Sequence, residues 1–140
     1  MTKQKEVLVL FEDGIIREES VLYSIELARR LELPISLLML VSDETQIFRA
    51  DEALINESIG PVEQAGIEVF KEIRAGDKTA ELLKYLAANS SPAAIVWGSD
   101  KEIVGKLGAG KSHYWLHRLT GMLPCSIVWP VSKNKGINKK

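Results

Sequence analysis

The sequence contains one cysteine, few aromatic residues and no excess of charge of either sign. The single cysteine, Cys125, excludes an internal disulfide bond and a zinc site built from several cysteines. It also favours a reducing compartment, so we expect a cytoplasmic protein. The 18 lysine and arginine residues are balanced by 19 aspartate and glutamate residues, for a formal net charge of −1. This balance argues against nucleic acid as a partner, because a nucleic-acid footprint requires a clearly basic domain.

Long apolar runs are absent as well. The longest, near Leu33–Val41, is interrupted by Pro34 and Ser36 and is too short to span a bilayer. Residues Met1–Glu6 lack the apolar core of a signal peptide, so we expect no membrane span and no export. What the sequence does have is 46% hydrophobic residues in a chain of 140, enough for a folded core. We expect one domain at residues 1–132 and a flexible basic tail at residues 133–140.

Five short apolar segments, each bounded by turn-forming residues, are predicted strands. They are Val7–Phe11, Ile35–Val41, Ile67–Ile73, Ala94–Trp97 and Ser126–Trp129. The first, second and fourth are continuously apolar, which is typical of a parallel sheet covered by helices on both faces. The third alternates apolar and charged residues, which indicates an edge strand with one wet face.

Helical patterns separate the strands. The predicted helices are Glu18–Leu31, a weaker one at Ala50–Gln64 broken by Gly60-Pro61, Thr79–Ala88 capped by Asp77, and Ser112–Leu123. On the first helix, one stripe is expected to face the core: Val21, Leu22, Ile25, Ala28 and Leu31. Alternating strands and helices predict an α/β fold with a doubly wound parallel sheet and right-handed crossovers.

Open sheets of this kind bind ligands beyond the carboxyl ends of their strands, where the winding direction reverses. Glu12, Asp13 and Gly14 follow the first predicted strand, and a loop rich in glycine and lysine, Gly98–Ser112, follows the fourth. Glycines let backbone N–H groups approach a phosphate, and the start of the next helix adds free donors. The loop is therefore either an anion-binding element or a plain connector.

The same loop formally matches the Walker A spacing at Gly105, Gly110, Lys111 and Ser112. That motif requires its first glycine directly after a strand, whereas Gly105 lies seven residues beyond Gly98. A slow nucleotide hydrolase that uses Lys111, Ser112 and Mg²⁺ is kept as an alternative hypothesis.

Taken together, several segments resemble universal stress proteins in order and spacing. These segments are Lys5–Gly14, Glu26–Leu31, Gly66–Val69, Ala75–Asp77, Ala94–Ser99 and Pro124–Val131, so that the resemblance covers roughly residues 5–131. It implies a Rossmann-like five-stranded sheet in the order 3-2-1-4-5, with the winding reversing between the first and fourth strands. It also implies a binding or signalling module and a homodimer formed through the last strand, Ser126–Val131.

In family members that bind ATP, adenine lies near the acidic residue after strand one and the backbone after strand two. Those positions are Glu12 or Asp13, with Gly14, and Val41-Ser42 in this chain. The resemblance therefore implies an adenine nucleotide, ATP or AMP with Mg²⁺, as a candidate ligand.

The family holds phosphates with a Gly-x2-Gly-x9-Gly-[Ser/Thr] loop, which falls on Gly98, Lys101, Lys111 and Ser112. The second and third glycines of the family pattern are thus lysines in this chain. Two nearby glycines, Gly108 and Gly110, take their place if the register shifts. Ser99, at the start of the loop, is a further candidate ligand-binding residue. A third hypothesis is a ligand-free dimeric interaction protein, which predicts that substitutions at Gly98 and Ser112 are tolerated.

Other residues carry weaker signals. His113 and His117 have the i, i+4 spacing of a metal pair, but no acidic residue or cysteine on that helix completes a site, so a polar surface is expected. Cys125 is expected to be a buried inert thiol, and Trp97, Trp115 and Trp129 are expected in the core or an interface.

Overall fold

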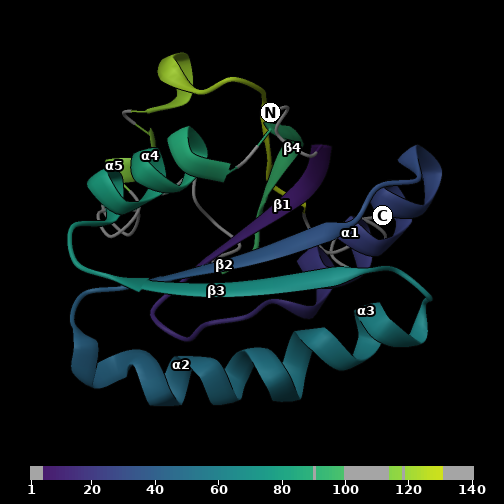
Figure 1. Cartoon of the computed structure of the whole chain (residues 1–140), viewed down its shortest axis with the longest axis horizontal. Helices are drawn as coiled ribbons and strands as arrows, with labels where there is room; N and C mark the ends of the chain where they lie inside the picture. The colour runs from purple at the N-terminus through teal and green to yellow at the C-terminus, as the bar shows by residue number, and fades with distance from the viewer. Residues whose placement is uncertain (1–4, 90, 100–113, 118, 131–140) are drawn as a thin grey trace, which may run out of the picture.

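The computed structural model describes residues 5–89, 91–99, 114–117 and 119–130. In chain order its elements are β1 (Lys5–Glu12), α1 (Glu18–Leu31), β2 (Ile35–Val41), η1 (Glu44–Gln46), α2 (Ile47–Leu54), η2 (Ile55–Ile59), α3 (Gly60–Gln64), β3 (Val69–Ala75), α4 (Lys78–Asn89), β4 (Ser91–Trp97), α5 (Tyr114–His117), η4 (Thr120–Met122) and β5 (Ile127–Val128). Figure 1 shows the sheet between two layers of helices.

The five strands form one parallel sheet in the order β3-β2-β1-β4-β5. The predicted doubly wound α/β fold and its strand order are confirmed. β1 pairs with β2 from Val7 opposite Ile35 to Glu12 opposite Leu40, so the two strands end side by side. β4 flanks β1 on its other side and ends at Trp97, opposite Leu10, so β1 extends beyond it to Glu12.

Both faces of the sheet are covered, which explains the continuous apolar strands. Val7, Val9 and Phe11 of β1 point to the face covered by α1, α2 and α3. Leu8 and Leu10 point to the opposite face, where α4 and α5 pack. Because alternate residues of a strand face opposite sides of the sheet, a strand covered on both sides has no solvent-exposed side chain.

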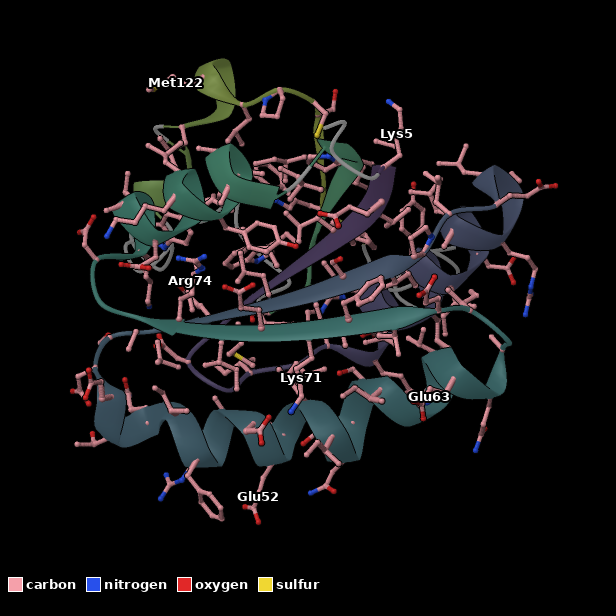
Figure 2. All side chains as sticks on the ribbon, in the orientation of Figure 1. Lys5, Glu52, Glu63, Lys71, Arg74 and Met122 are labelled. Carbon is pink, nitrogen blue, oxygen red and sulfur yellow. The ribbon has the colours of Figure 1, made fainter. Side chains whose placement is uncertain are left out.

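The edge strand β3 differs from the central strands. Figure 2 shows Lys71 and Arg74 leaving opposite faces of β3. Lys71 forms an ion pair with Asp51 of α2, and Arg74 forms one with Glu81 of α4 at 3.2 Å. The predicted edge position is confirmed, and the charged residues of β3 anchor a helix on each face.

The second helical region departs from the prediction. The chain is helical from Ile47 to Gln64, and Gly60-Pro61 does not break it. Instead a π-helical turn at Ile55–Ile59 precedes Pro61, which lies in the first turn of α3. Proline lacks an N–H and clashes with the carbonyl four residues earlier, and a widened turn just before it relieves both problems.

The predicted core stripe of α1 is partly wrong. Leu22 and Leu31 are 51% and 45% exposed, whereas Ser20 and Ser24 are buried. The buried serines are satisfied because Ser20 Oγ donates to the Trp97 carbonyl at 2.9 Å and Ser24 Oγ donates to the Ser20 carbonyl at 2.8 Å. The remaining stripe residues are buried as predicted: Val21, Ile25 and Ala28.

The predicted helix Ser112–Leu123 is shorter among the described residues, since only Tyr114–His117 is α-helical and Thr120–Met122 is a 3₁₀ turn. The fifth strand is also short, at Ile127–Val128. None of the helices in the described ranges is long and apolar enough to cross a bilayer.

Candidate functional site

The winding of the sheet reverses between β1 and β4, and open α/β sheets generally bind ligands beyond the carboxyl ends of their strands at such a reversal. β1 ends at Glu12, and β4 is followed by Gly98 and Ser99. The sequence prediction placed the site at these two strand ends, and the structure brings them together.

A tight turn follows β1. Asp13 has φ +55° and Gly14 has φ +76°, both in the left-handed region, which aspartate and glycine adopt most readily. Ile15 N–H closes the turn on the Glu12 carbonyl at 3.1 Å. The residues Glu12-Asp13-Gly14 thus reverse the chain and leave two adjacent carboxylates at the carboxyl end of the central strand β1.

Ser99 holds this turn against β4. Its hydroxyl accepts a hydrogen bond from Glu12 N–H at 2.7 Å and donates one to the Ile15 carbonyl at 2.6 Å. Ser99 is only 2% exposed. The predicted ligand-binding residue Ser99 therefore has a structural role here, as a bridge between the ends of β1 and β4.

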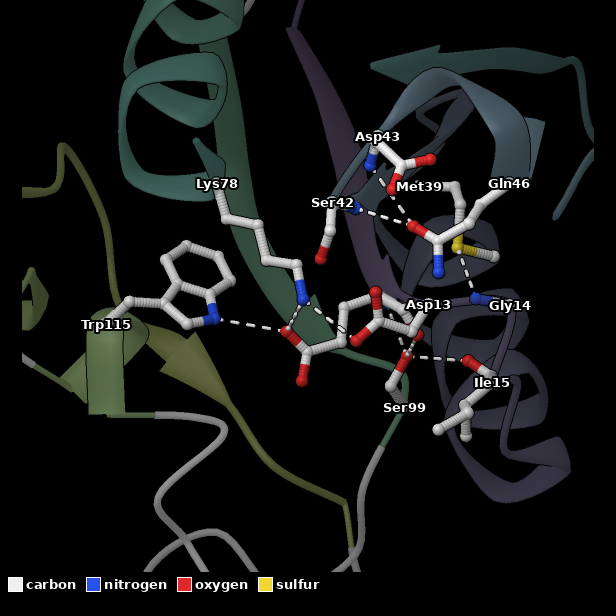
Figure 3. Close-up of polar contacts among 11 residues, drawn as sticks. Asp13, Gly14, Ile15, Met39, Ser42, Asp43, Gln46, Lys78, Ser99 and Trp115 are labelled. Carbon is white, nitrogen blue, oxygen red and sulfur yellow. Dashed lines mark hydrogen bonds and ion pairs between the residues drawn. The ribbon is translucent and has the colours of Figure 1, made fainter. Parts of the chain in front are cut away.

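Glu12 is 2% exposed, so its carboxylate is buried within the protein. Figure 3 shows the side chains of Lys78 and Trp115 converging beside Asp13. Glu12 Oε1 accepts from Lys78 Nζ at 3.0 Å and from Trp115 Nε1 at 3.1 Å. Lys78 Nζ also lies 2.8 Å from Asp13 Oδ2. One lysine therefore serves both carboxylates of the turn, and residues from β1, α4 and α5 meet at one point.

The charge state of Lys78 follows from these contacts. Burial by itself lowers the pKa of Lys78, but the hydrogen bonds and negative charges of Asp13 and Glu12 outweigh it, so the net effect raises the pKa. Lys78 is accordingly a stable cation at neutral pH, with two carboxylates as its partners.

The local sequence explains why Lys78 reaches this point. Asp77 caps α4, since its Oδ2 accepts from Ala80 N–H at 2.9 Å, as predicted. Gly76, with φ +131°, turns the chain from β3 into the helix, and its N–H donates to the Val41 carbonyl at 3.0 Å. Lys78 is then the first residue of α4 and extends over the end of β1.

A hollow of about 290 Å³ opens beside the turn, on the side of α2. It lies at the lower end of ligand-pocket sizes, so it suits one ring system better than a whole large ligand. Its lining is formed by the β1 turn, the end of β2 and the start of α2: Asp13, Gly14, Val41, Thr45, Gln46, Arg49 and Ala50. Three residues predicted for the base of a nucleotide, Asp13, Gly14 and Val41, thus share one concave surface.

The side chain of Gln46, which lines the hollow, binds the backbone that follows β2. Gln46 Oε1 accepts from Ser42 N–H at 2.9 Å and from Asp43 N–H at 3.2 Å. Asp43 Oδ1 in return accepts from Thr45 N–H at 2.9 Å, which completes a capping box. This reciprocal pair caps η1, which leads directly into α2, and fixes the orientation of the Gln46 amide.

Gly98 is packed tightly. Its N–H donates to the Leu10 carbonyl and its carbonyl accepts from Arg17 N–H, both at 2.8 Å. A Cβ at this position would lie 2.4 Å from Phe11 Cε1. Gly98 is required by close packing, whatever the loop binds. Substitution at Gly98 is therefore expected to disturb packing in a ligand-free protein as much as in a ligand-binding one, and it does not distinguish the two hypotheses.

The remaining predicted phosphate-binding residues lie outside the described residues: Lys101, Gly108, Gly110, Lys111 and Ser112. The Walker A match from Gly105 lies there too, so the hydrolase hypothesis stays a prediction. The same holds for His113 and for the side chain of His117. Cys125 is half-buried, and burial raises the pKa of its thiol.

Sequence analysis did not identify Lys78, Gln46 or Arg49 as site residues, and it assigned Trp115 only to a core or an interface. No local motif marks them, because each reaches the site through the fold. A second buried carboxylate, Glu6, lies at the other end of β1, where Ser36 Oγ donates to it at 2.7 Å. It is remote from the strand ends that form the site.

Comparisons with known proteins agree with this architecture. No family model matches the sequence, and no curated protein matches it. Among solved structures, a universal stress protein from Archaeoglobus fulgidus matches with a TM-score of 0.59 and 15% sequence identity. The match covers 87% of this chain and 96% of that chain. The chain therefore has the fold of a universal stress protein, which confirms the resemblance seen in its sequence at the level of the fold.

Proposed function

We propose that this protein is a universal stress protein-type module that binds a purine nucleotide at the carboxyl ends of β1 and β2. The observation that carries the proposal is the hollow lined by Asp13, Gly14 and Val41. Open α/β sheets bind ligands beyond the carboxyl ends of their strands, and the hollow lies beyond the ends of β1 and β2, next to the switch point between β1 and β4. The hollow also lies where the family resemblance implies the base of ATP or AMP.

The hollow can be tested with nucleotides directly. We expect millimolar ATP or GTP, with and without Mg²⁺, to raise the thermal unfolding temperature of the protein. A ligand at about 100 times its dissociation constant adds roughly 2.7 kcal/mol, or about 5–10 °C for a domain of this size. Differential scanning calorimetry measures the shift.

Two substitutions in η1 test whether the nucleotide-induced rise in unfolding temperature arises from binding in the hollow. Thr45 lines the hollow and Glu44 does not, although both are exposed residues of η1. Thr45→Trp is expected to abolish the nucleotide-induced shift by filling the hollow, whereas Glu44→Trp is expected to retain it. No shift with either nucleotide, or equal shifts in both variants, would contradict the proposal.

A specific observation favours a second candidate, a ligand-free interaction module. Glu12 already has Lys78 and Trp115 as partners, and Ser42 and Asp43 N–H groups are already bonded to Gln46. A site whose polar groups satisfy one another is stable without a ligand. The absence of any nucleotide effect in calorimetry would select this candidate.

The last strand provides the expected partner surface. β5 pairs with β4 through Ile95 opposite Ile127 and Val96 opposite Val128, and within the described ranges no strand pairs with its other edge. Arg17 Nη1 donates to the Pro130 carbonyl at 2.7 Å and fixes the chain just after β5. An apolar edge of this kind favours pairing with a second copy.

We expect a homodimer through this edge. Sedimentation equilibrium at micromolar protein concentration is expected to give twice the mass of the chain. A monomer under those conditions would contradict the dimer.

A further inference from the structure

Few hydrogen-bonding groups that line the hollow beside the β1 turn lack a partner in the protein. These few groups determine which ligand the hollow can bind. The Gln46 amide oxygen and the Val41 carbonyl already accept hydrogen bonds. Gly14 N–H already contacts Met39 Sδ at 3.2 Å. Within the part of the chain that the structure describes, the Gln46 amide oxygen, the Val41 carbonyl and Gly14 N–H thus already have partners in the protein.

Three side-chain groups remain. They are the second carboxylate oxygen of Asp13, the Gln46 amide nitrogen and the Arg49 guanidinium, which form no hydrogen bond or ion pair among the described residues. Figure 3 shows the Gln46 amide nitrogen on the side of the Gly14 turn. The hollow therefore offers a carboxylate acceptor on the β1 side and, beside the Thr45 hydroxyl that donates to Asp43, two side-chain donors on the α2 side.

These groups discriminate between purine bases. Along its edge, adenine presents N1, N6 and N7 as acceptor, donor and acceptor, a pattern that suits an amide with its donor and acceptor side by side. Guanine presents two adjacent acceptors, O6 and N7, and two adjacent donors, N1–H and N2–H. An arginine fork matches the paired acceptors, and a carboxylate matches the paired donors.

We infer that the hollow takes the base of a 6-oxopurine nucleotide in preference to adenine, with Arg49 and Gln46 facing O6 and N7 and Asp13 facing the ring and exocyclic N–H groups. This inference rests on the proposed function and specifies its ligand class. The carboxylate of Asp13 retains its contact with Lys78, because each carboxylate oxygen accepts more than one hydrogen bond.

The test compares GMP with AMP by isothermal titration calorimetry, since monophosphates keep the comparison on the base. Wild-type protein is expected to bind GMP at least about 10-fold more tightly than AMP, a difference of about 1.4 kcal/mol. Arg49→Gln is expected to weaken GMP binding by about 10-fold and to leave AMP binding unchanged. Arg30→Gln, at an exposed arginine of α1 remote from the hollow, is the matched control and is expected to behave as wild type.

Each outcome is decisive. AMP binding as tight as GMP binding, or GMP binding unaffected by Arg49→Gln, overturns the inference and leaves nucleotide binding standing. Binding of neither nucleotide overturns the proposed function and the inference with it. Circular dichroism of Arg49→Gln confirms that the variant is folded, which is expected because Arg49 is exposed.

Discussion

Replacing Lys78 by methionine is expected to lower the free energy of unfolding by about 3 kcal/mol, because it removes one partner of the ion pair with the buried Glu12 carboxylate. Glu12 is 2% exposed, and Trp115 Nε1 donates to the same Oε1 atom at 3.1 Å. Removing one partner of a buried ion pair costs more than the pair contributes, since the other charge stays desolvated. Urea denaturation followed by fluorescence measures the change.

Two further variants separate this effect from the loss of a lysine as such. Lys84→Met, on the same helix but with a side chain that is 65% exposed, is expected to change stability by less than about 0.5 kcal/mol. The double variant Glu12→Gln/Lys78→Met is expected to recover most of the loss, because neither partner of the Glu12–Lys78 pair is then charged. Equal losses of unfolding free energy in Lys78→Met and Lys84→Met would contradict the claim that Lys78 and Glu12 form a buried ion pair.

The same ion pair sets part of the pH dependence of stability. The pKa of Lys78 is raised above its usual 10.5, so its contribution is complete below that pH and is lost as the pH rises through the folded-state value. The alkaline fall in unfolding free energy is therefore expected to be shallower in Lys78→Met than in wild type.

Gly98→Ala is expected to destabilise the protein by about 1–3 kcal/mol, the range typical of overpacked cores. The new methyl carbon would lie 2.4 Å from Phe11 Cε1 and 3.1 Å from Val9 Cγ1, and both residues are buried. Neither ring nor strand can move without disturbing β1, which lies at the centre of the sheet. Urea denaturation at neutral pH gives the cost.

Gly60→Ala provides the control, because no atom lies within 4 Å of a Cβ built there and the residue is helical. It is expected to be neutral or slightly stabilising. In a Phe11→Leu background the cost of Gly98→Ala is expected to shrink, since the clashing ring atoms are gone. A cost near zero for Gly98→Ala in wild type would contradict the packing described for the end of β4.

The fold could largely be predicted because the hydrophobic pattern that indicates each strand lies within a short segment of the sequence. Strands buried on both faces are continuously apolar, whereas β3 alternates apolar and charged residues because some of its side chains are solvent-exposed. The order of the elements could therefore be predicted from the hydrophobic pattern. The failures have physical causes. Ser20 and Ser24 are buried because each hydroxyl finds a backbone carbonyl, and a π-helical turn lets the chain stay helical up to Pro61.

The candidate site was predictable only where it follows a strand directly. Glu12, Asp13 and Gly14 were found because they end β1, and strand ends are where such sheets bind. Lys78 comes from a position 66 residues after Glu12, and its neighbours in sequence give no sign of the contact. Ser99 was assigned to a ligand, but its hydroxyl is used to hold the β1 turn.

The most direct test of nucleotide binding in the hollow is a titration of ¹⁵N-labelled protein with GMP, followed by amide chemical shifts. We predict that the largest shifts occur at Gly14, Gln46 and Ala50, which line the hollow. Unchanged spectra would contradict the account. So would shifts confined to the separate groove between α2 and β3 at Phe48 and Lys71, because that groove lies away from the end of β1.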